Sequence, residues 1–482
     1  MTLSIIPNRR DLLSLIIFVL GASSVTAAES SRPNVLVILA DDMGWSDLGC
    51  YGADLHETPR IDQLAKESVR FTNAYAMSVC SPTRATLMTG KHAARLHYTI
   101  WSEGAESGGP KNRRLRDAEA IWNLPHSEKT LAERLHEAGY LTALVGKWHL
   151  GDWQHYPESH GFDINIGGTN WGAPQTFWWP YSGSGRFGDG FRYVPHLEFG
   201  KPGEYLTDRL TDEAMKVMDR AGEQPFFVYL AHHSVHTPIE AKEADVKHFD
   251  AKLNPQMHHQ HAVYAAMMKN LDENVGRVLD HLKERGLDQN TLVIFASDNG
   301  GYVGPDKASG RDMPVTNNAP LRSGKGSLYE GGIRIPLMIR WPGVTQSGVC
   351  DEPVVTMDLF NTLLRAAGQK SEVSDGIDLA PVLKEPSSIL EREALFFHYP
   401  HYYATTTPGS AVRVGDWKLL EFFEDNHVEL YNLADDLAEG HDLSEERPDQ
   451  VTEMRMRLHG WRESVGAALP TPNPDFKTKP QK

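Results

Sequence analysis

Short runs that are apolar at almost every position alternate along this chain with amphipathic segments of helical length. The runs occupy residues 34–40, 141–145, 226–231 and 292–296, and the longest amphipathic segment, residues 264–285, leads into the last of them. A strand with polar residues on neither face is buried on both faces, which is typical of a parallel sheet covered by helices. The alternation therefore predicts an α/β fold, with a large, mainly parallel sheet and helices on both of its faces.

The sequence pattern changes near both ends of the chain. Residues 1–28 carry two Arg residues, then an apolar run, then small residues, which is typical of a secretory signal peptide rather than of a buried N-terminal helix. We expect residues 33–385 to form the main domain and residues 386–470 a smaller C-terminal α+β subdomain. Residues 471–482 are rich in Pro and Lys and are expected to be a frayed tail.

Local signals predict where several elements begin and end. Thr58 followed by Pro59 predicts a helix start, and Thr130 with Glu133 forms a capping box for another helix. We expect surface loops at 102–117 and 300–327, short C-terminal strands at 395–398, 411–420 and 428–431, and a final helix at about 448–463.

The charge balance limits the class of partner. The chain has 48 Lys and Arg residues against 64 Asp and Glu residues, a net charge of −16. An acidic surface repels polyanions, which argues against nucleic acid as a partner. An anionic substrate would need a strongly local positive site. No stretch after residue 28 is long and apolar enough for a transmembrane helix, so we expect no membrane anchor.

The cysteine count agrees with an exported protein that is not built on disulfides. Cys50, Cys80 and Cys350 are an odd set, so at least one thiol is unpaired or altered. Whether Cys50 and Cys350 pair stays open. No Asn-x-Ser/Thr acceptor is present, and with the signal peptide this favours a bacterial protein that is periplasmic or secreted.

Polar side chains follow the apolar runs at the points where the strands should end. Asp41 and Asp42 follow the first run, and Asp298 and Asn299 follow the run at 292–296. The carboxyl ends of parallel strands meet at one edge of the sheet, where ligands bind. Carboxylate and amide oxygens suit a hard cation, Ca²⁺ or Mg²⁺, better than zinc. The alternative is that these residues are ordinary turn formers.

The segment around Cys80 predicts a helix start with unusual chemistry. Ser81 can serve as N-cap and Pro82 as the first helical residue, and Gly90 closes the helix. Cys80 would then lie just before a helix N-terminus, where an anion is favoured, and Arg84 in the first turn could contact that anion. The alternative is a buried, inert Cys before a capped helix.

Four further polar residues complete the candidate site. Lys147 and His149 follow the run at 141–145 with the two-residue spacing that places both on one side of an extended segment. His236 follows the run at 226–231, and Lys325 lies in a Gly-rich loop. Each alone could be structural, but together with a cation and a helix N-terminus they predict a site for a tetrahedral oxyanion.

These motifs together resemble the type I sulfatases, relatives of alkaline phosphatase. The resemblance begins with Cys80-Ser-Pro-Thr-Arg84 and the Ala-Thr-Leu-Met-Thr-Gly that follows it. It extends over about residues 33–445 and includes, in family order, Asp41-Asp42, Gly146-Lys147-Trp148-His149-Leu-Gly151, His236-Thr-Pro238, Ser297-Asp298-Asn299-Gly300, Gly324-Lys325-Gly-Ser-Leu-Tyr-Glu-Gly-Gly332 and Asp375-Gly-Ile-Asp378.

The resemblance implies a fold, a reaction and a modified side chain. It implies an alkaline-phosphatase-like catalytic domain and hydrolysis of sulfate esters. It also implies that a maturase, as a transient partner, oxidises Cys80 to formylglycine, whose hydrate is the nucleophile. One Ca²⁺ ion, rather than Mg²⁺, would be bound by Asp41, Asp42, Asp298, Asn299 and modified Cys80.

The resemblance further assigns roles around the sulfate group. Arg84 would neutralise developing charge, and Lys147 and Lys325 would hold sulfate oxygens. His149 would exchange a proton with the hydrated side chain, and His236 would help to protonate the leaving alcohol.

The substrate is indicated only by class. The segment 170–181 is dense in aromatic residues, which either stack on sugar rings or pack the loop onto the core, and the segment 397–402 resembles the part of these enzymes that approaches the substrate. We therefore expect a sulfated carbohydrate or another sulfated small molecule. The alternatives are a phosphonate or phosphodiester hydrolase of the same superfamily and a non-catalytic glycan-binding relative.

Overall fold

The structure is a computed structural model that describes residues 32–188, 190–197, 199–306, 309–370 and 374–477. The expected signal peptide and the last five residues of the expected tail lie outside these ranges. Within the described residues, the main sheet has nine strands: β1 (Asn34–Ala40), β2 (Val69–Tyr75), β4 (Leu141–Gly146), β5 (Ile164–Ile166), β6 (Phe226–Ala231), β7 (Thr291–Ser297), β8 (Arg334–Arg340), β9 (Gly348–Cys350) and β10 (Val354–Val355).

The strand order is β10-β2-β8-β7-β1-β6-β4-β5, and β9 pairs beside β2. The central strand β1 is parallel to both of its neighbours, β6 and β7, and β4 is parallel to β6 and β5. Only β8 among these described strands runs antiparallel to its partners, β7 and β2. The prediction of a large, mainly parallel sheet is confirmed.

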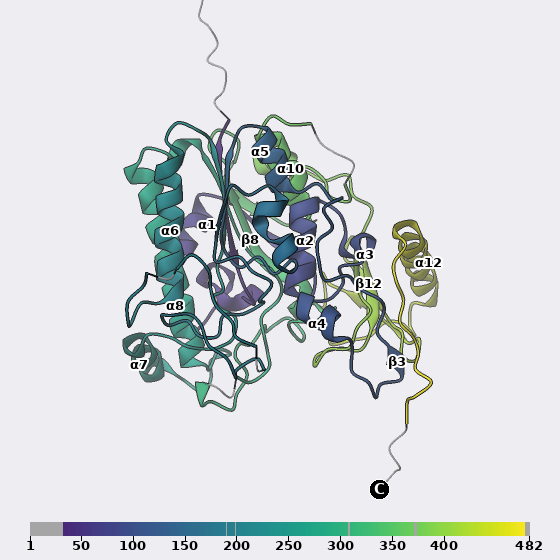
Figure 1. Cartoon of the computed structure of the whole chain (residues 1–482). Helices are drawn as coiled ribbons and strands as arrows, with labels where there is room; N and C mark the ends of the chain where they lie inside the picture. Colours follow the sequence, from purple (N-terminus) through teal and green to yellow (C-terminus); the bar gives the residue numbers. More distant parts are fainter. Residues whose placement is uncertain (1–31, 189, 198, 307–308, 371–373, 478–482) are drawn as a thin grey trace, which may run out of the picture. The chain divides into compact units, whose positions relative to one another are not determined.

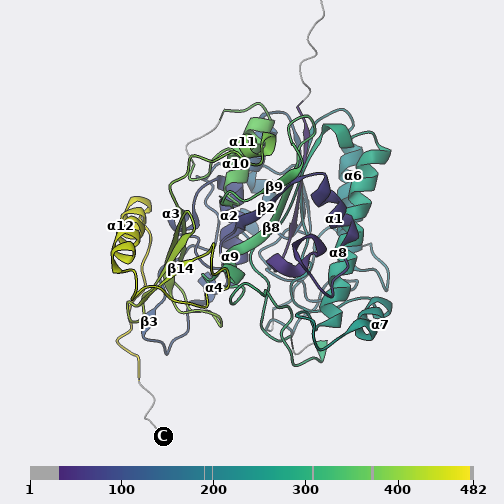
Figure 2. The same ribbon diagram turned by 180° about the vertical axis from the view of Figure 1, so that it is seen from behind.

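Alternate side chains of β1 enter two different cores, which explains its continuous apolar sequence. Val35 and Val37 join one core, and Leu36 and Ile38 join the other. Both faces of the sheet are therefore covered by helices (Figure 1, and Figure 2 from behind). The first core includes residues of α2 (Cys80–Thr89), α5 (Leu131–Glu137) and α10 (Asp358–Ala366), and the second includes residues of α1 (Pro59–Lys66), α6 (Leu206–Ala221) and α8 (Ala262–Glu284).

The expected capping box forms at the start of α5. The Glu133 amide donates to Thr130 Oγ1 at 3.1 Å, and the Thr130 amide donates to Glu133 Oε2 at 2.7 Å. The shorter helices of the main domain are α3 (Ala93–Leu96), α4 (Ser102–Ser107), α7 (Glu243–Lys252), α9 (Glu330–Ile333) and α11 (Ala380–Lys384), with 3₁₀ turns η1 (Trp45–Asp47), η2 (Gly49–Tyr51), η3 (Trp153–His155), η4 (Pro157–His160) and η5 (Asp288–Asn290).

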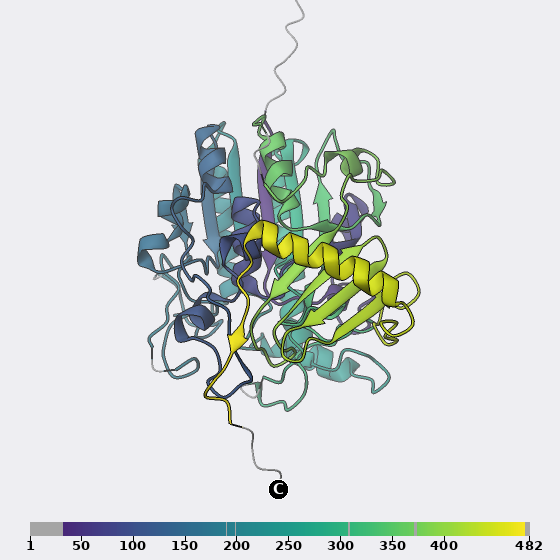
Figure 3. The ribbon, with the colours of Figure 1, turned by 90° about the vertical axis from the view of Figure 1, so that its right-hand side faces the viewer.

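The C-terminal part of the chain forms a second, antiparallel sheet, as the α+β prediction requires. Its strands lie in sequence order: β11 (Leu395–Tyr399), β12 (Gly409–Val414), β13 (Trp417–Phe422) and β14 (Val428–Asn432). Helix α12 (Pro448–Val465) packs on one face through Met454 and Leu458 (Figure 3). The prediction of one strand over 411–420 is wrong, because Gly415 adopts a φ of +55° and turns the chain into a hairpin.

Two loop predictions also need correction. The segment 102–117 contains α4 and the short strand β3 (Leu115–Arg116), and β3 pairs with β15 (Thr471–Pro472) of the segment expected to be a frayed tail. The Gly- and Ser-rich composition hid α4, whose first turn packs closely on its own N-cap residue: a Cβ on Gly104 would come within 2.7 Å of the Trp101 ring. The loop 300–327 is not entirely on the surface, because Lys325 is buried.

Within the described ranges, no helix has the length and apolar character needed to span a membrane. Cys50, Cys80 and Cys350 are all free thiols, so Cys50 and Cys350 do not form a disulfide in this structure.

Candidate active site

The carboxyl ends of four adjacent strands bring the predicted polar residues together. Strands β7, β1, β6 and β4 are neighbours and run parallel, so their carboxyl ends lie at one edge of the sheet. The chain leaves these strands at Asp298 and Asn299, at Asp41 and Asp42, before His236, and at Lys147 and His149.

Asp42 lies at the centre of a buried network. Its Oδ1 accepts a hydrogen bond from Asn299 Nδ2 at 2.9 Å and pairs with Lys325 Nζ at 2.6 Å. Its amide donates to Asp298 Oδ1 at 3.2 Å, and its Oδ2 lies 3.5 Å from His236 Nε2. Burial alone would raise the pKa of Asp42, but Lys325 and His236 hold that pKa below its usual range. Asp42 is therefore a carboxylate.

Asp41 is the second buried acid of the network. Its Oδ2 accepts from Lys147 Nζ at 2.7 Å, and both side chains are completely buried. Burial, together with the nearby carboxylates Asp298 and Asp42, raises the pKa of Asp41 well above its ordinary value despite Lys147. Neighbouring carboxyl groups repel one another when all of them are ionised, and such groups are a typical setting for a bound cation.

Two buried oxygens in this network lack protein partners. Asp41 Oδ1 and Asn299 Oδ1 find no hydrogen-bond partner among the described residues. Buried polar atoms are nearly always paired, so orphaned acceptors need an explanation. Asp41, Asp42 and His236 also offer ligand atoms that lie within 4.8 Å of one another. The donor set is mostly oxygen and fits a hard divalent cation.

Arg84 is buried and holds two parts of the site together. Its Nε and Nη2 donate to Asp298 Oδ2 at 3.1 and 2.8 Å, and its Nη1 donates to the Lys147 carbonyl at 2.8 Å. Both members of the Arg84–Asp298 ion pair are completely buried. Arg84 thus holds Asp298, a candidate cation ligand, in a fixed position relative to the backbone at Lys147.

Cys80 is the first residue of α2, so the helix begins two residues earlier than the sequence predicted. Ser81 is not the N-cap, because Val79 occupies that position and Ser81 Oγ donates to the His149 carbonyl at 2.9 Å. Cys80 Sγ lies 3.4 Å from His149 Nδ1. Burial would raise the pKa of the Cys80 thiol, but Lys147, His149 and Lys325 lower it to about 6. The surroundings of this side chain stabilise negative charge.

Glu103 is a site residue that the sequence reasoning missed. Its Oε2 lies 2.5 Å from His149 Nε2, and its Oε1 accepts from the Gly172 amide at 2.9 Å. Burial would lower the pKa of His149, but Glu103 and Cys80 raise it. No local signal marks Glu103, because its contact with His149 depends on how α4 packs.

The two other His residues after β6 are buried beside the site. The described structure offers no hydrogen-bond partner to either ring nitrogen of His232 or His233. Burial lowers the pKa of His232 to about 3, and burial with Lys147 and Arg84 lowers the pKa of His233 well below its ordinary value. Both rings are therefore neutral.

The aromatic loop after β5 (residues 170–181) mainly packs onto the core. Phe177 and Tyr181 are buried in the second core, and Phe177 stacks on Tyr205 at a centroid distance of 5.6 Å. The loop contributes Gly172 to the site, because a Cβ at this position would come within 2.4 Å of His149 Cε1.

The C-terminal subdomain reaches the site through one aromatic residue. Phe397 and Tyr399 are buried, so most of the segment 397–402 packs the subdomain rather than lining a cleft. Tyr403, the next residue, lies over Gly326, where a Cβ would meet its ring at 2.1 Å. Tyr403 thus lies beside Lys325.

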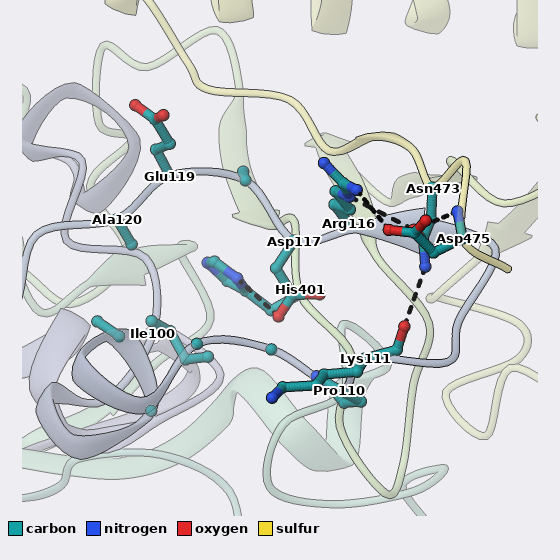
Figure 4. A pocket seen from close by; sticks show the side chains of 15 residues that line it. Ile100, Pro110, Lys111, Arg116, Asp117, Glu119, Ala120, His401, Asn473 and Asp475 are labelled. Atoms are coloured by element: carbon teal, nitrogen blue, oxygen red, sulfur yellow. Dashed lines mark hydrogen bonds and ion pairs between the residues drawn. The ribbon is translucent and has the colours of Figure 1, made fainter.

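A cavity of about 800 Å³ is lined in part by Gly104, the residue after Glu103 in the sequence (Figure 4). Asp117 and His401 face each other in it, with 3.3 Å between Asp117 Oδ2 and His401 Nδ1. Lys111 and Arg116 supply cationic groups. The other lining residues are Ile100, Ala105, Gly108, Gly109, Pro110, Ala118, Glu119, Ala120, Asn473 and Asp475.

Comparison with known proteins identifies the family. The family model described as Sulfatase matches residues 33–369. The chain belongs to the sulfatase family. A second model, described as N-sulphoglucosamine sulphohydrolase, C-terminal, matches residues 324–464 of this sulfatase.

Relatives of this sulfatase cover most of its length. A sulfatase of Formosa agariphila is 32% identical, over 93% of this chain and 92% of the relative. The N-acetylgalactosamine-6-sulfatase of Rattus norvegicus is 32% identical, over 89% of this chain and 79% of the relative. The crystal structure of Ps i-CgsB in complex with k-i-k-neocarrahexaose has a TM-score of 0.75 and 28% identity, covering 93% of this chain and 95% of that one. This protein is a sulfuric ester hydrolase.

Proposed function

We propose that this sulfatase hydrolyses sulfate esters of carbohydrates, with residue 80 as the nucleophile after conversion of Cys80 to formylglycine. The observation that supports this most strongly is the environment of Cys80 Sγ, which stands for the hydroxyl oxygens on Cβ of the hydrated aldehyde. It lies 3.4 Å from His149 Nδ1, at the start of a helix. Lys147 and Lys325 favour negative charge there. These are the groups that an attacking oxygen and a sulfate group require.

The acidic cluster is proposed to bind one Ca²⁺ ion. The proposed ligands are oxygens of Asp41, Asp42, Asp298 and Asn299, with a fifth from modified Cys80. The orphaned Asp41 Oδ1 and Asn299 Oδ1 support this assignment. The ion would stabilise negative charge on the oxygens of residue 80 and of the sulfate group.

Side chains of the protein itself would carry out the remaining steps of the reaction. Hydrated formylglycine supplies two hydroxyl groups, one that attacks sulfur as the ester O–S bond breaks and one that later expels sulfate as the aldehyde re-forms. Lys147 and Lys325 orient the sulfate oxygens, and Arg84 holds Asp298 in place. His149 accepts the proton of the reacting hydroxyl group through Nδ1, the nitrogen nearest Cys80.

His236 is proposed to protonate the leaving alcohol. Its Nδ1 donates to the Thr237 carbonyl at 2.7 Å, which directs Nε2 toward Asp42 and the site. Burial lowers the pKa of His236 to about 3 in the absence of substrate. An anionic ester bound beside the ring favours its protonated form, so substrate binding would charge the proton donor.

The cavity that contains Asp117 and His401 is proposed to accept the carbohydrate portion of the substrate. Its charged and amide side chains suit sugar hydroxyl and sulfate groups. Arg116 already pairs with Asp475 at 2.9 Å, whereas Lys111 is exposed. Lys111→Ala should therefore raise KM for a sulfated oligosaccharide more than KM for a small aryl sulfate. Equal effects on both substrates would contradict this placement.

Export and maturation complete the proposal. We propose that residues 1–28 direct export to the periplasm or the medium and that a maturase modifies Cys80. We also propose residues 33–385 as the catalytic domain and residues 386–470 as the C-terminal subdomain.

The decisive experiment compares unmodified and modified protein. Protein produced with a maturase should show formylglycine at position 80 by mass spectrometry and should release sulfate from sulfated oligosaccharides. Cys80→Ala should keep its melting temperature and lose turnover. Full turnover by Cys80→Ala would exclude residue 80 as nucleophile. Faster hydrolysis of a phosphodiester than of a sulfate ester would favour the phosphodiesterase alternative.

A further inference from the structure

A cluster of three His residues lies beside Trp148, the residue between Lys147 and His149. His126 lies in an exposed turn, His155 ends η3 and His160 ends η4. The His126 ring stacks on His155 at a centroid distance of 4.4 Å and on His160 at 4.9 Å. One ring nitrogen from each residue lies within 4.8 Å of the others.

We propose that His126, His155 and His160 form a second metal site, for a divalent ion that prefers nitrogen ligands, with Zn²⁺ as its first candidate. Three imidazoles with no carboxylate among them suit Zn²⁺, Cu²⁺ or Ni²⁺. This preference differs from that of the acidic cluster, whose mostly oxygen donors suit Ca²⁺.

The tautomer of His155 is set by the backbone. Its Nδ1 lies 2.8 Å from the Leu124 carbonyl, which accepts only, so Nδ1 carries the proton. The lone pair is therefore on Nε2. A ligating His typically donates its other ring N–H to a backbone carbonyl in this way.

His160 supplies a buried nitrogen with nothing to bind it. The residue is 1% exposed, and the described parts of the chain give its Nε2 no hydrogen-bond partner. Burial and the two neighbouring rings lower its pKa to about 4, so the ring is neutral at physiological pH. A neutral, buried and unpaired imidazole nitrogen is the state that metal binding requires.

His126 is the adjustable member of the site. In a tetrahedral site with Zn–N bonds of about 2.0–2.1 Å, the nitrogens lie about 3.3 Å apart. The nitrogens here lie within 4.8 Å of one another, and the exposed His126 ring would have to turn out of its stacked arrangement to direct its lone pair at an ion shared with His155 and His160. The fourth ligand position would then be taken by water from the exposed side.

The location indicates what the bound ion would do. Trp148 Nε1 donates to the His155 carbonyl at 2.8 Å, and the Trp148 ring lies 5.7 Å from the His160 ring. Trp148 stands between Lys147 and His149 in the sequence. An ion that joins His126, His155 and His160 would therefore brace the segment that carries two active-site residues.

The test is Zn²⁺ binding to the Ca²⁺-saturated protein, measured by isothermal titration calorimetry and by melting temperature. Excess Ca²⁺ occupies the acidic cluster, and neither measurement depends on turnover. His126 is exposed, so His126→Ala should fold. His441→Ala, which removes an imidazole 71% exposed in the C-terminal subdomain, is the matched control.

We expect wild type and His441→Ala to bind one Zn²⁺ ion with a rise in melting temperature, and His126→Ala to bind it at least 10-fold more weakly. A wild-type protein that takes up no Zn²⁺ under these conditions overturns the proposal. Binding that is unchanged in His126→Ala also overturns it.

Discussion

The contact between Glu103 and His149 gives the sharpest test of the active-site geometry. Glu103→Gln replaces a carboxylate 2.5 Å from His149 Nε2 with a neutral amide of nearly the same shape. The amide oxygen can still accept from the Gly172 amide, so the loop keeps its anchor. The variant therefore changes the charge beside His149 while it preserves the packing of α4.

The size of the effect follows from one hydrogen bond to a charged group. Such a bond contributes about 1.5–3 kcal/mol, and if it stabilises protonated His149 in the transition state, its loss lowers kcat by about 10- to 150-fold. Glu103 raises the pKa of His149 against the effect of burial. In Glu103→Gln the apparent pKa assigned to His149 should therefore move to lower pH.

The assay is the pH dependence of kcat and kcat/KM for sulfate release by the matured enzyme. Glu106→Gln is the matched control, because Glu106 is an exposed acid on the same helix. An unchanged kcat and pH profile in Glu103→Gln would refute the reasoning. A loss of the same size in Glu106→Gln would show that the net charge of α4, not the contact with His149, matters.

Further predictions concern stability, pH and metal. Lys418 pairs with Glu330 and Glu439 at 2.8 Å each, all three buried, so Lys418→Met should lower the free energy of unfolding by about 3–5 kcal/mol in urea titrations. Burial and Glu330 raise the pKa of Glu439 to about 7 against the effect of Lys418, so the folded state binds the extra proton. Stability from this group should fall as pH rises from about 4.5 to 7, and Glu439→Gln should flatten that dependence in melting curves. Chelation by EGTA should abolish turnover and remove about 2.7 kcal/mol of stability relative to Ca²⁺ at 100 times its Kd, and added Ca²⁺ should restore both. Gly172→Ala should push on the His149 ring and lower kcat by up to about 100-fold with little change in melting temperature.

The sequence was informative about the fold where local and global signals agree. The apolar runs that became β1, β4, β6 and β7 were predicted within one or two residues, because a strand buried on both faces has no polar positions. The prediction of one strand over 411–420 failed, because Gly415 in a left-handed conformation reverses the chain within an otherwise continuous strand pattern.

Most members of the candidate site were predicted from the sequence, but Glu103 was missed, and the roles of all of them stay proposals. Asp41, Asp42, Asp298 and Asn299 could be placed together because parallel strands end at one edge of a sheet. The N-cap of α2 was misassigned, because the helix already includes Ser81, whose Oγ donates to the His149 carbonyl in the segment after β4.

The central strands, the covered faces of the sheet and the residues at its carboxyl edge were thus determined by the sequence itself, whereas the strand order came from the structure. Only the tertiary structure decided that Glu103 pairs with His149, that Arg84 binds Asp298 and the Lys147 carbonyl, and which two acceptors remain unpaired. The physical reason is the range of the interactions. Hydrophobic periodicity and turn chemistry act between residues close in sequence, whereas a buried ion pair depends on segments that meet only when the core has packed.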